Sequence, residues 1–158
     1  MSIRNIIIKS LGTFFYVGYL PFIPGTFASV IGIFLYYLLK DNPLTYILFT
    51  ISLIILGFLV SGRAEEIFQR KDPRFVVIDE VSGMLLGLMF MLYIPFDIKL
   101  VIIAFFLFRL LDTFKPYPAG AFQHMKGSLG VMMDDIIAGL YTNIILQVVL
   151  NLASFKTS

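Results

Sequence analysis

Three charged residues at regular spacing are the first feature of the sequence that could do chemistry. Arg109, Asp112 and Lys115 follow the apolar run Leu100–Phe108 at intervals of three residues. On a helix this spacing keeps them on one broad face, and Pro116 predicts that the helix ends at the residue before it. Charges at the mouth of an apolar helix are costly unless nearby groups use them. We therefore expect other parts of the chain to supply partners for these charges.

Two predicted helix starts carry carboxylates in the same arrangement, with a glycine four residues after an acid. The residues are Asp79, Glu80 and Gly83 at the first start, and Asp134, Asp135 and Gly139 at the second. A glycine on the same helical face as the acid allows another helix or a ligand to approach closely. A helix N-terminus also favours a negative charge by about 0.3–1 kcal/mol. The two helix starts are therefore predicted to contribute to one site.

The acids favour a metal site built from oxygen ligands. Clustered carboxylates repel one another unless a cation bridges them, and Mg²⁺ prefers oxygen ligands. The chain has no cysteine, which excludes thiolate ligands, disulfides and cysteine nucleophiles, and its single histidine, His124, excludes a histidine-rich site within one chain. The predicted Mg²⁺ ligands are Asp79, Glu80, Asp134 and Asp135, with Asp112 reaching the same face and Asn143 two turns beyond Asp135. The alternative is that these acids cap helices and form ion pairs with Arg63, Arg74, Arg109 and Lys115.

A second set of residues could hold phosphate. Thr26 and Ser29 lie one helical turn apart after the Pro24-Gly25 turn, where hydroxyl and free N–H groups could bind an anion. The alternative for Thr26 is that it only caps the helix. Arg109 and Lys115 could bind phosphate oxygens, or could extend from a helix end toward water.

Composition places these residues in a membrane protein. The 158 residues form a single predicted domain, 1–158, and they are 59% hydrophobic and 14% charged, with a mean hydropathy of +0.93. The net charge of +2 is too small to indicate a nucleic-acid partner. We read the start of the chain as mature protein because no small-residue cleavage site follows its apolar patch.

Helices must position these charges. The chain is predicted to be an all-α, polytopic integral membrane protein, a bundle of about five membrane helices. The segment Asn5–Pro21 is predicted as an interfacial or re-entrant helix. The predicted membrane helices are Thr26–Leu39, Leu44–Gly62, Val81–Phe96, Ile98–Lys115 and Asp134–Ala153, and Pro116–Met133 is predicted as a loop with at most one short helix. Several of these helices are shorter than the roughly 20 residues of a full crossing. Either the bilayer thins locally, or the charged helix ends lie below the headgroup level, at the depth of a phospholipid's glycerol.

Alternating crossings separate the charges between the two sides of the membrane. One side collects Arg63, Arg70, Lys71, Arg74, Arg109, Lys115 and Lys126, whereas Lys40, Lys99 and Lys156 fall opposite. The positive-inside rule makes the first side cytoplasmic. Of the ten acids only Asp41 and Asp97 fall on the other side, and acids do not set topology, so their clustering predicts a shared site.

Four ordered motifs, taken together, resemble the phosphatidylglycerophosphatase A family. They are Pro24-Gly25-Thr26 with Ser29, Val77–Met84, Phe108–Pro118 and Gly127–Gly139, and the similarity runs from about Gly12 to Asn143. The resemblance implies a Mg²⁺-dependent lipid phosphatase of the bacterial cytoplasmic (inner) membrane, with its site facing the cytoplasm. It also implies the last step of phosphatidylglycerol synthesis, in which phosphatidylglycerophosphate becomes phosphatidylglycerol and inorganic phosphate.

This resemblance leads to a mechanistic hypothesis. Asp79, Glu80, Asp134 and Asp135 would bind Mg²⁺, and Asp112 would be a further ligand or the base. Water would attack the terminal phosphate while Arg109 and Lys115 neutralise charge on its oxygens. The alternative mechanism is a covalent aspartyl-phosphate on Asp79 or Asp112.

Two other classes of protein compete with this interpretation. A CDP-alcohol phosphatidyltransferase should show an Asp-Gly-x-x-Ala-Arg string, which this sequence lacks. A non-enzymatic transporter or channel should have charged or broken-helix elements near the bilayer midplane. Almost all charges here fall at one set of predicted helix ends, which disfavours that class.

Overall fold

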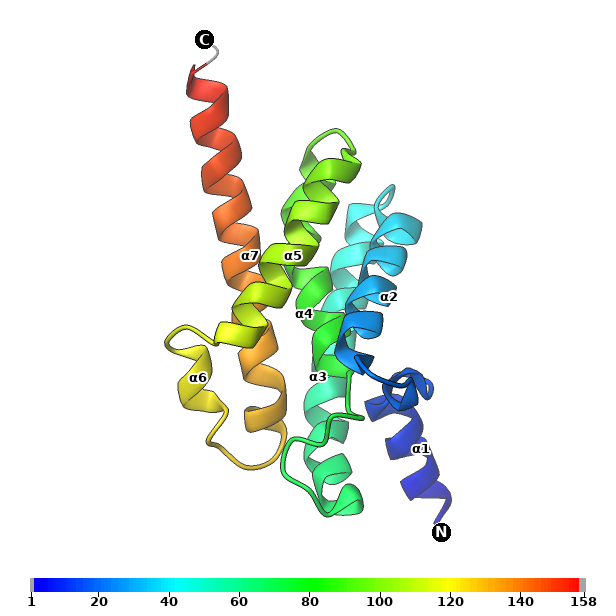
Figure 1. Cartoon of the computed structure of the whole chain (residues 1–158). Coiled ribbons are helices and arrows are strands. Elements are labelled where there is room, and N and C mark those ends of the chain that lie inside the picture. Colours follow the sequence, from blue (N-terminus) through cyan, green and yellow to red (C-terminus); the bar gives the residue numbers. More distant parts are fainter. Residues whose placement is uncertain (1, 157–158) are drawn as a thin grey trace.

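The computed structural model describes the backbone of residues 2–156 and the side chains of residues 2–152, and in this part of the chain every regular element is helical (Figure 1). The α-helices are α1 (Ile3–Gly12), α2 (Pro24–Leu39), α3 (Pro43–Phe68), α4 (Ile78–Leu88), α5 (Ile98–Phe114), α6 (Ala119–Phe122) and α7 (Ser128–Lys156). Two 3₁₀ turns, η1 (Val17–Tyr19) and η2 (Met89–Tyr93), complete the set. The all-α prediction is confirmed for the described residues.

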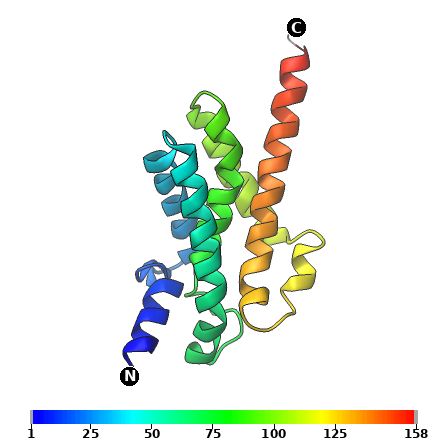
Figure 2. The ribbon, with the colours of Figure 1, turned by 180° about the vertical axis from the view of Figure 1, so that it is seen from behind.

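Helix α4 lies at the centre of the bundle and packs against α2, α3, α5 and α7 (Figure 2). Its crossing with α7 depends on two glycines that face each other. A Cβ added to Gly83 would lie 2.6 Å from the backbone oxygen of Asp135, and one added to Gly139 would lie 3.2 Å from the Cα of Gly83. The prediction that these glycines allow close helix approach is therefore confirmed, and the contact fixes the acid-bearing parts of α4 and α7 beside each other.

The third predicted membrane helix, Val81–Phe96, is corrected by the structure, because α4 ends at Leu88 and continues only as η2. Pro95 holds the preceding Ile94 in an extended conformation, so the helical segment cannot continue beyond η2. The early end leaves backbone carbonyl groups that need donors. The side chains of Tyr46 and Asn143 donate to the carbonyl oxygens of Leu85 and Leu86, at 2.6 and 3.1 Å.

Other helix boundaries also differ from those predicted. Helix α2 begins at Pro24, so Thr26 is inside its first turn and does not cap it. Helix α3 continues to Phe68, because the charged residues after Gly62 still suit an exposed helix. Helix α7 begins at Ser128, directly after Gly127 in the left-handed region (φ +74°). The predicted fourth helix is confirmed to within one residue at its end.

The N-terminal segment Asn5–Pro21 is not one helix. Helix α1 ends at Gly12, and Phe14, Phe15 and Tyr16 then take positive φ values before η1. Gly18 packs against the backbone of Phe75, where any side chain would collide. The segment therefore folds back along the bundle end instead of running straight.

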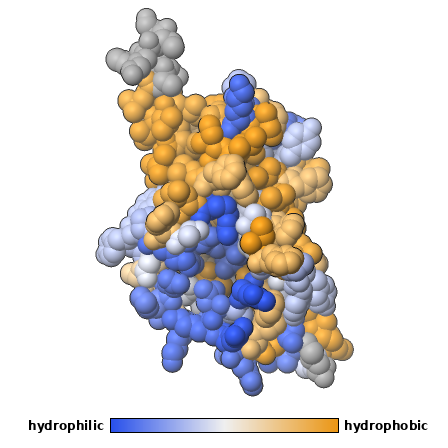
Figure 3. All heavy atoms as spheres, in the orientation of Figure 1, coloured by the Kyte–Doolittle hydropathy of each residue, from blue (hydrophilic) through white to orange (hydrophobic). Residues whose placement is uncertain are grey.

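Hydrophobic side chains cover much of the bundle surface. Within the described residues, two helices are long and apolar enough to span a membrane, Pro43–Phe68 and Ser128–Leu152. Hydrophilic residues gather around α6 and the neighbouring loops in the lower half of Figure 3, whereas the upper half is mainly hydrophobic. These features support membrane association, and the five crossings and their orientation stay predictions.

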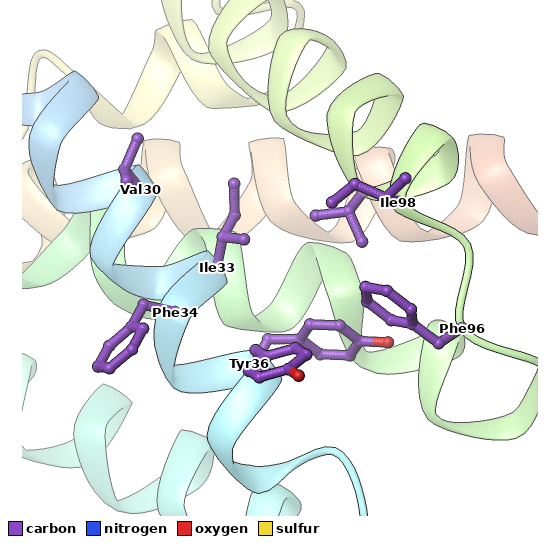
Figure 4. Close-up of a pocket in the computed structure, with 8 residues that line it drawn as sticks. Val30, Ile33, Phe34, Tyr36, Phe96 and Ile98 are labelled. Atoms are coloured by element: carbon purple, nitrogen blue, oxygen red, sulfur yellow. The ribbon is translucent and has the colours of Figure 1, made fainter.

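An apolar groove of about 330 Å³ lies between α2 and α5 in the hydrophobic half. Figure 4 shows Val30, Ile33 and Phe34 along α2, with Phe96 and Ile98 on the opposite wall. The groove lies toward the end of α2 and the start of α5, at the opposite end of the bundle from the carboxylates.

Candidate functional site

A polar cavity of about 220 Å³ lies where α4 begins, α5 ends and the early turns of α7 pass. Its lining residues are Asp72, Arg74, Val76, Asp79, Glu80, Asp112, Lys115, Asp134 and Asp135. The structure therefore brings together the acids of both predicted helix starts and the predicted residues Asp112 and Lys115.

Three carboxylates form the centre of this cavity. One oxygen each from Asp79, Glu80 and Asp135 can be chosen so that all lie within 4.8 Å of one another. Asp79 and Asp135 are each only 4% exposed. Asp79 and Glu80 occupy the first turn of α4, as predicted.

Asp134 and Asp135 do not open a helix, contrary to the sequence prediction. They lie almost two turns inside α7, which begins at Ser128. Their carboxylates therefore gain little from the N-terminus of α7, since that effect fades beyond the first turn. The close contact of Gly83 with α7 is what places Asp135 beside Asp79.

The donor set fits a hard divalent cation. Two like charges about 4 Å apart repel by roughly 4 kcal/mol at an effective dielectric constant near 20. Among the described residues, buried oxygens of Glu80 (Oε2) and Asp135 (Oδ1) have no hydrogen-bond donor. Unpaired buried oxygens in a cluster of carboxylates are the ligands a cation such as Mg²⁺ requires.

Lys115 reaches the cavity because the backbone turns at the end of α5. Lys115 follows the last helical residue and has a φ of +47°. Its ammonium group donates a short hydrogen bond to Oδ2 of Asp134, and the two side chains are 19% and 5% exposed. Lys115 therefore neutralises one acid and remains at the cavity wall, where it can contact an anion.

Arg109 is not among the residues that line the cavity. Its Nη1 lies 2.8 Å from Oδ2 of Asp112, without the alignment of a hydrogen bond. The guanidinium also lies against the first turn of α2, because a Cβ on Gly25 would be 3.3 Å from Nη1 and would collide with the Glu80 carboxylate. The structure therefore places Arg109 behind Glu80 and Asp112, where it balances their charge.

Asp72 and Arg74 line the cavity but were not predicted as site residues. Both lie on the loop of residues 69–77, which joins α3 to α4. Asp72 is an exposed residue, yet partial burial of its carboxyl group and repulsion from Asp134 raise its pKa above the ordinary value. The available signal was the run of charges just before Asp79, between the second and third predicted membrane helices.

Besides Arg109, three predicted substrate-binding residues lie outside the cavity. The hydroxyl of Ser29 is buried and donates to the backbone oxygen of Gly25. Thr26 is half-buried on the same turn. Asn143 lines a separate pocket between α4 and α7 and bonds to the carbonyl of Leu86. The first two can support the turn at Gly25, and Asn143 stabilises the end of α4.

This arrangement suits the binding of a phosphorylated ligand. Buried carboxylates can hold a divalent cation, and Lys115 supplies a positive charge beside them. Such sites bind phosphate oxygens and position a water molecule for attack on phosphorus.

Comparisons with known proteins identify a family for the chain. The family model for phosphatidylglycerophosphatase A matches residues 10–150. A Bacteroides thetaiotaomicron protein with the provisional name phosphatidylinositol-3-phosphatase is 38% identical over 149 residues, which cover 87% of this chain and 90% of that protein.

Two other relatives are named phosphatidylglycerophosphatase A. The Escherichia coli K12 protein is 33% identical over 126 residues, covering 78% of this chain and 72% of its own length. The Haemophilus influenzae protein is 27% identical over 125 residues, covering 77% and 76%. No solved structure gives a significant match.

Proposed function

Since the chain belongs to the phosphatidylglycerophosphatase A family, we propose that it is a single-domain membrane phosphatase that hydrolyses phosphatidylglycerophosphate to phosphatidylglycerol and inorganic phosphate. This reaction would complete the synthesis of phosphatidylglycerol. The observation that carries the proposal is the cluster of Asp79, Glu80 and Asp135 beside Lys115. A phosphate monoester needs both a cation and a positive side chain to bind its charged oxygens, and this cavity offers groups for both.

Mg²⁺ is the proposed cofactor because every candidate ligand is a carboxylate. Asp79, Glu80 and Asp135 would hold it, with Asp134 as a further ligand through the oxygen that does not bond to Lys115. When bound, Mg²⁺ supplies Lewis-acid polarisation of phosphate and favours deprotonation of water.

The side chains of the cavity have distinct proposed roles. Lys115 binds phosphate oxygens and counters their increasing charge. Asp112 accepts a proton from the water that attacks phosphorus. The bond from phosphorus to the glycerol oxygen breaks, and that oxygen takes up a proton from solvent water and leaves as an alcohol. Arg109 balances the charge of Asp112 and Glu80 and orients their carboxyl groups, instead of contacting phosphate itself.

A covalent aspartyl-phosphate on Asp79 or Asp112 is the alternative mechanism. Acid-quenching the protein during turnover of substrate that carries ³²P in its terminal phosphate distinguishes the two. Direct attack by water leaves the denatured protein unlabelled. Bound ³²P that hydroxylamine releases from the denatured protein would instead support the covalent route.

A second substrate is favoured by one relative. The Bacteroides protein is named for phosphatidylinositol 3-phosphate, which also carries a phosphate monoester on a lipid headgroup. The two substrates differ in the leaving group, a ring alcohol in the inositol lipid and a primary alcohol in the glycerol lipid.

The deciding experiment is phosphate release by the purified protein from each lipid, with Mg²⁺ and with a chelator. We expect release from phosphatidylglycerophosphate, lost on chelation and restored by added Mg²⁺. Preference for the inositol lipid would move the chain to the second activity. Absence of release from both lipids, or release that a chelator leaves unchanged, would contradict the proposal.

The proposed location is the bacterial cytoplasmic membrane, with several helices crossing it and the cavity facing the cytoplasm. The support comes from the excess of lysine and arginine at the end of the bundle that contains the cavity. A substrate made at the cytoplasmic surface could then reach the cavity without crossing the membrane.

A further inference from the structure

The carboxylate of Glu65 joins two loops that are far apart in the sequence. Its Oε1 accepts the backbone N–H of Asp72 at 2.8 Å, and its Oε2 accepts the backbone N–H of Gly127 at 2.6 Å. The Glu65 side chain is half-buried near the end of α3 and uses both carboxylate oxygens.

Both of these loops border the candidate site. The loop of residues 69–77 carries Asp72 and Arg74 to the cavity wall. Gly127 directly precedes α7, the helix that carries Asp134 and Asp135. A carboxylate that accepts from both loops therefore fixes one wall of the cavity relative to the helix opposite.

The conformation of the first loop needs such a restraint. Asp72 takes a φ of +44°, in the left-handed region that non-glycine residues rarely adopt. Its N–H group points to Glu65, so a local hydrogen bond to a charged acceptor offsets the strain. Loss of the carboxylate would leave this turn without the contact.

Arg74 is the group that the restrained loop delivers to the site. Its guanidinium lies 5.4 Å from the centre of the Phe75 ring, and the described residues offer it no ion-pair partner within 4.0 Å. Lys115, the other cation of the cavity, is already paired with Asp134. Arg74 is thus a cation free to bind a phosphate, and its planar guanidinium matches two phosphate oxygens at once.

We propose that Glu65 is a positioning residue that holds the loop of residues 69–77 against the cavity, so that Arg74 contacts the phosphate of the lipid substrate. This inference rests on the proposed phosphatase function for its ligand. The loop restraint itself is a property of the free protein, and it can be measured without any substrate.

The first test is hydrogen exchange in detergent, comparing the natural protein with Glu65→Ala, Glu65→Gln and Glu66→Gln. Glu66 is the matched control, because it is the next residue, it is exposed, and its one ion pair is a long 3.9 Å contact with Arg63. Glu65→Ala should speed exchange of the peptides that contain Asp72 and Gly127 by about tenfold, the factor for one lost hydrogen bond. Glu65→Gln keeps one acceptor oxygen, so its exchange rates should lie between those of the natural protein and Glu65→Ala. Unchanged exchange in Glu65→Ala would contradict the proposed restraint of the loop.

The second test is a double-mutant cycle on phosphate release from phosphatidylglycerophosphate. Glu65→Ala and Arg74→Ala should each raise KM by about tenfold with a smaller change in kcat, and Glu66→Gln should change neither. If Glu65 acts through Arg74, the double variant should be no worse than Arg74→Ala alone. Additive losses would overturn the link between the two residues.

The two tests separate the two claims. A natural protein that releases no phosphate, but whose exchange responds to Glu65→Ala, would contradict the proposed function and keep the loop restraint. A natural protein that is active, and whose KM is unaffected by both alanine variants, would contradict the role of Arg74 and keep the phosphatase.

Discussion

Lys115 and Asp134 illustrate how single residues obtain their roles in this protein. Lys115 leaves the helical path with a positive φ, and this turn directs its ammonium group to the carboxylate of Asp134 on another helix. Arg109, only six residues earlier, stays on α5 and pairs with Asp112. The two cations of one sequence motif therefore have different positions: Lys115 lies at the cavity wall, and Arg109 lies outside the cavity beside Asp112.

At this scale the buried carboxylates give the sharpest prediction. Asp79→Asn and Asp135→Asn each remove one charge from the proposed metal site while keeping the shape of the side chain. Each should lower kcat by about a hundredfold or more, since such ligands act on the reacting group itself. The thermal unfolding temperature should stay the same or rise, because each substitution removes a charge from a buried cluster of carboxylates.

The matched control for both variants is Asp41→Asn. Asp41 is exposed at the other end of the bundle and pairs only with its neighbour Lys40 among the described contacts. It should keep full activity. Full activity of both Asp79→Asn and Asp135→Asn would mean that the reaction does not use this cluster.

At the scale of the elements, the site depends on how closely α4 and α7 approach. Two backbones can come this near only where side chains are absent, as at Gly83 and Gly139. The same helix α4 ends early, and side chains from α3 and α7 supply donors to its free carbonyl groups. A short central helix thus serves both as the support for Asp79 and as the contact point of the bundle.

Gly83→Ala should destabilise the protein and disturb the site together. The new Cβ would meet the backbone oxygen of Asp135 at 2.6 Å and the ring of Phe108 at 2.9 Å, so the helices must separate. We expect a loss of about 1–3 kcal/mol in the free energy of unfolding, with reduced phosphate release. Thermal unfolding in detergent and the activity assay measure the two effects.

Gly87→Ala is the control for that substitution, because it adds the same methyl group to α4 at a less crowded position. Its Cβ would meet the side chain of Thr142 at 3.2 and 3.3 Å, and would lie in ordinary contact, 3.6 Å, with the backbone oxygen of Gly139. The gain in helix propensity of up to about 1 kcal/mol opposes this small crowding. An equal or larger loss in Gly87→Ala than in Gly83→Ala would contradict the proposed role of the Gly83 contact.

Tyr46→Phe tests the carbonyl groups at the end of α4. Tyr46 is fully buried, and its hydroxyl donates to the Leu85 oxygen at 2.6 Å. Its loss leaves a buried acceptor without a donor and should cost about 1–3 kcal/mol of unfolding free energy. Tyr37→Phe is the control, because that ring is 57% exposed, and equal melting temperatures for the two variants would contradict the argument.

At the scale of the whole molecule, charge and hydrophobicity are separated along the bundle. The cavity lies at the end where α6 and the hydrophilic loops gather, and the opposite half is mainly hydrophobic (Figures 1 and 3). A phosphate group on a lipid would then meet the carboxylates near the membrane surface, while the acyl chains stay beside the helices. This geometry is consistent with chemistry on a headgroup, and it gives the proposed orientation a direct test.

Single cysteines can report that orientation, since the natural chain has none. In whole cells, a membrane-impermeant maleimide should label Asp41→Cys, and it should label Lys126→Cys only after the membrane is opened. Both positions are exposed, so burial does not confound the comparison. The opposite pattern would place the cavity on the outer face, and labelling of both positions in intact cells would contradict opposite sides.

The sequence by itself determined the helical class, the apolar composition and most of the acidic site. Periodicity, glycine spacing and charge placement are local, so Asp79, Glu80 and the end of α5 could be identified without a structure. Only the tertiary structure decided where α7 begins, why Asn143 bonds to α4, and that Asp72 and Arg74 reach the cavity. These features depend on contacts between segments far apart in the chain, such as Glu65 with Gly127, which no local pattern encodes.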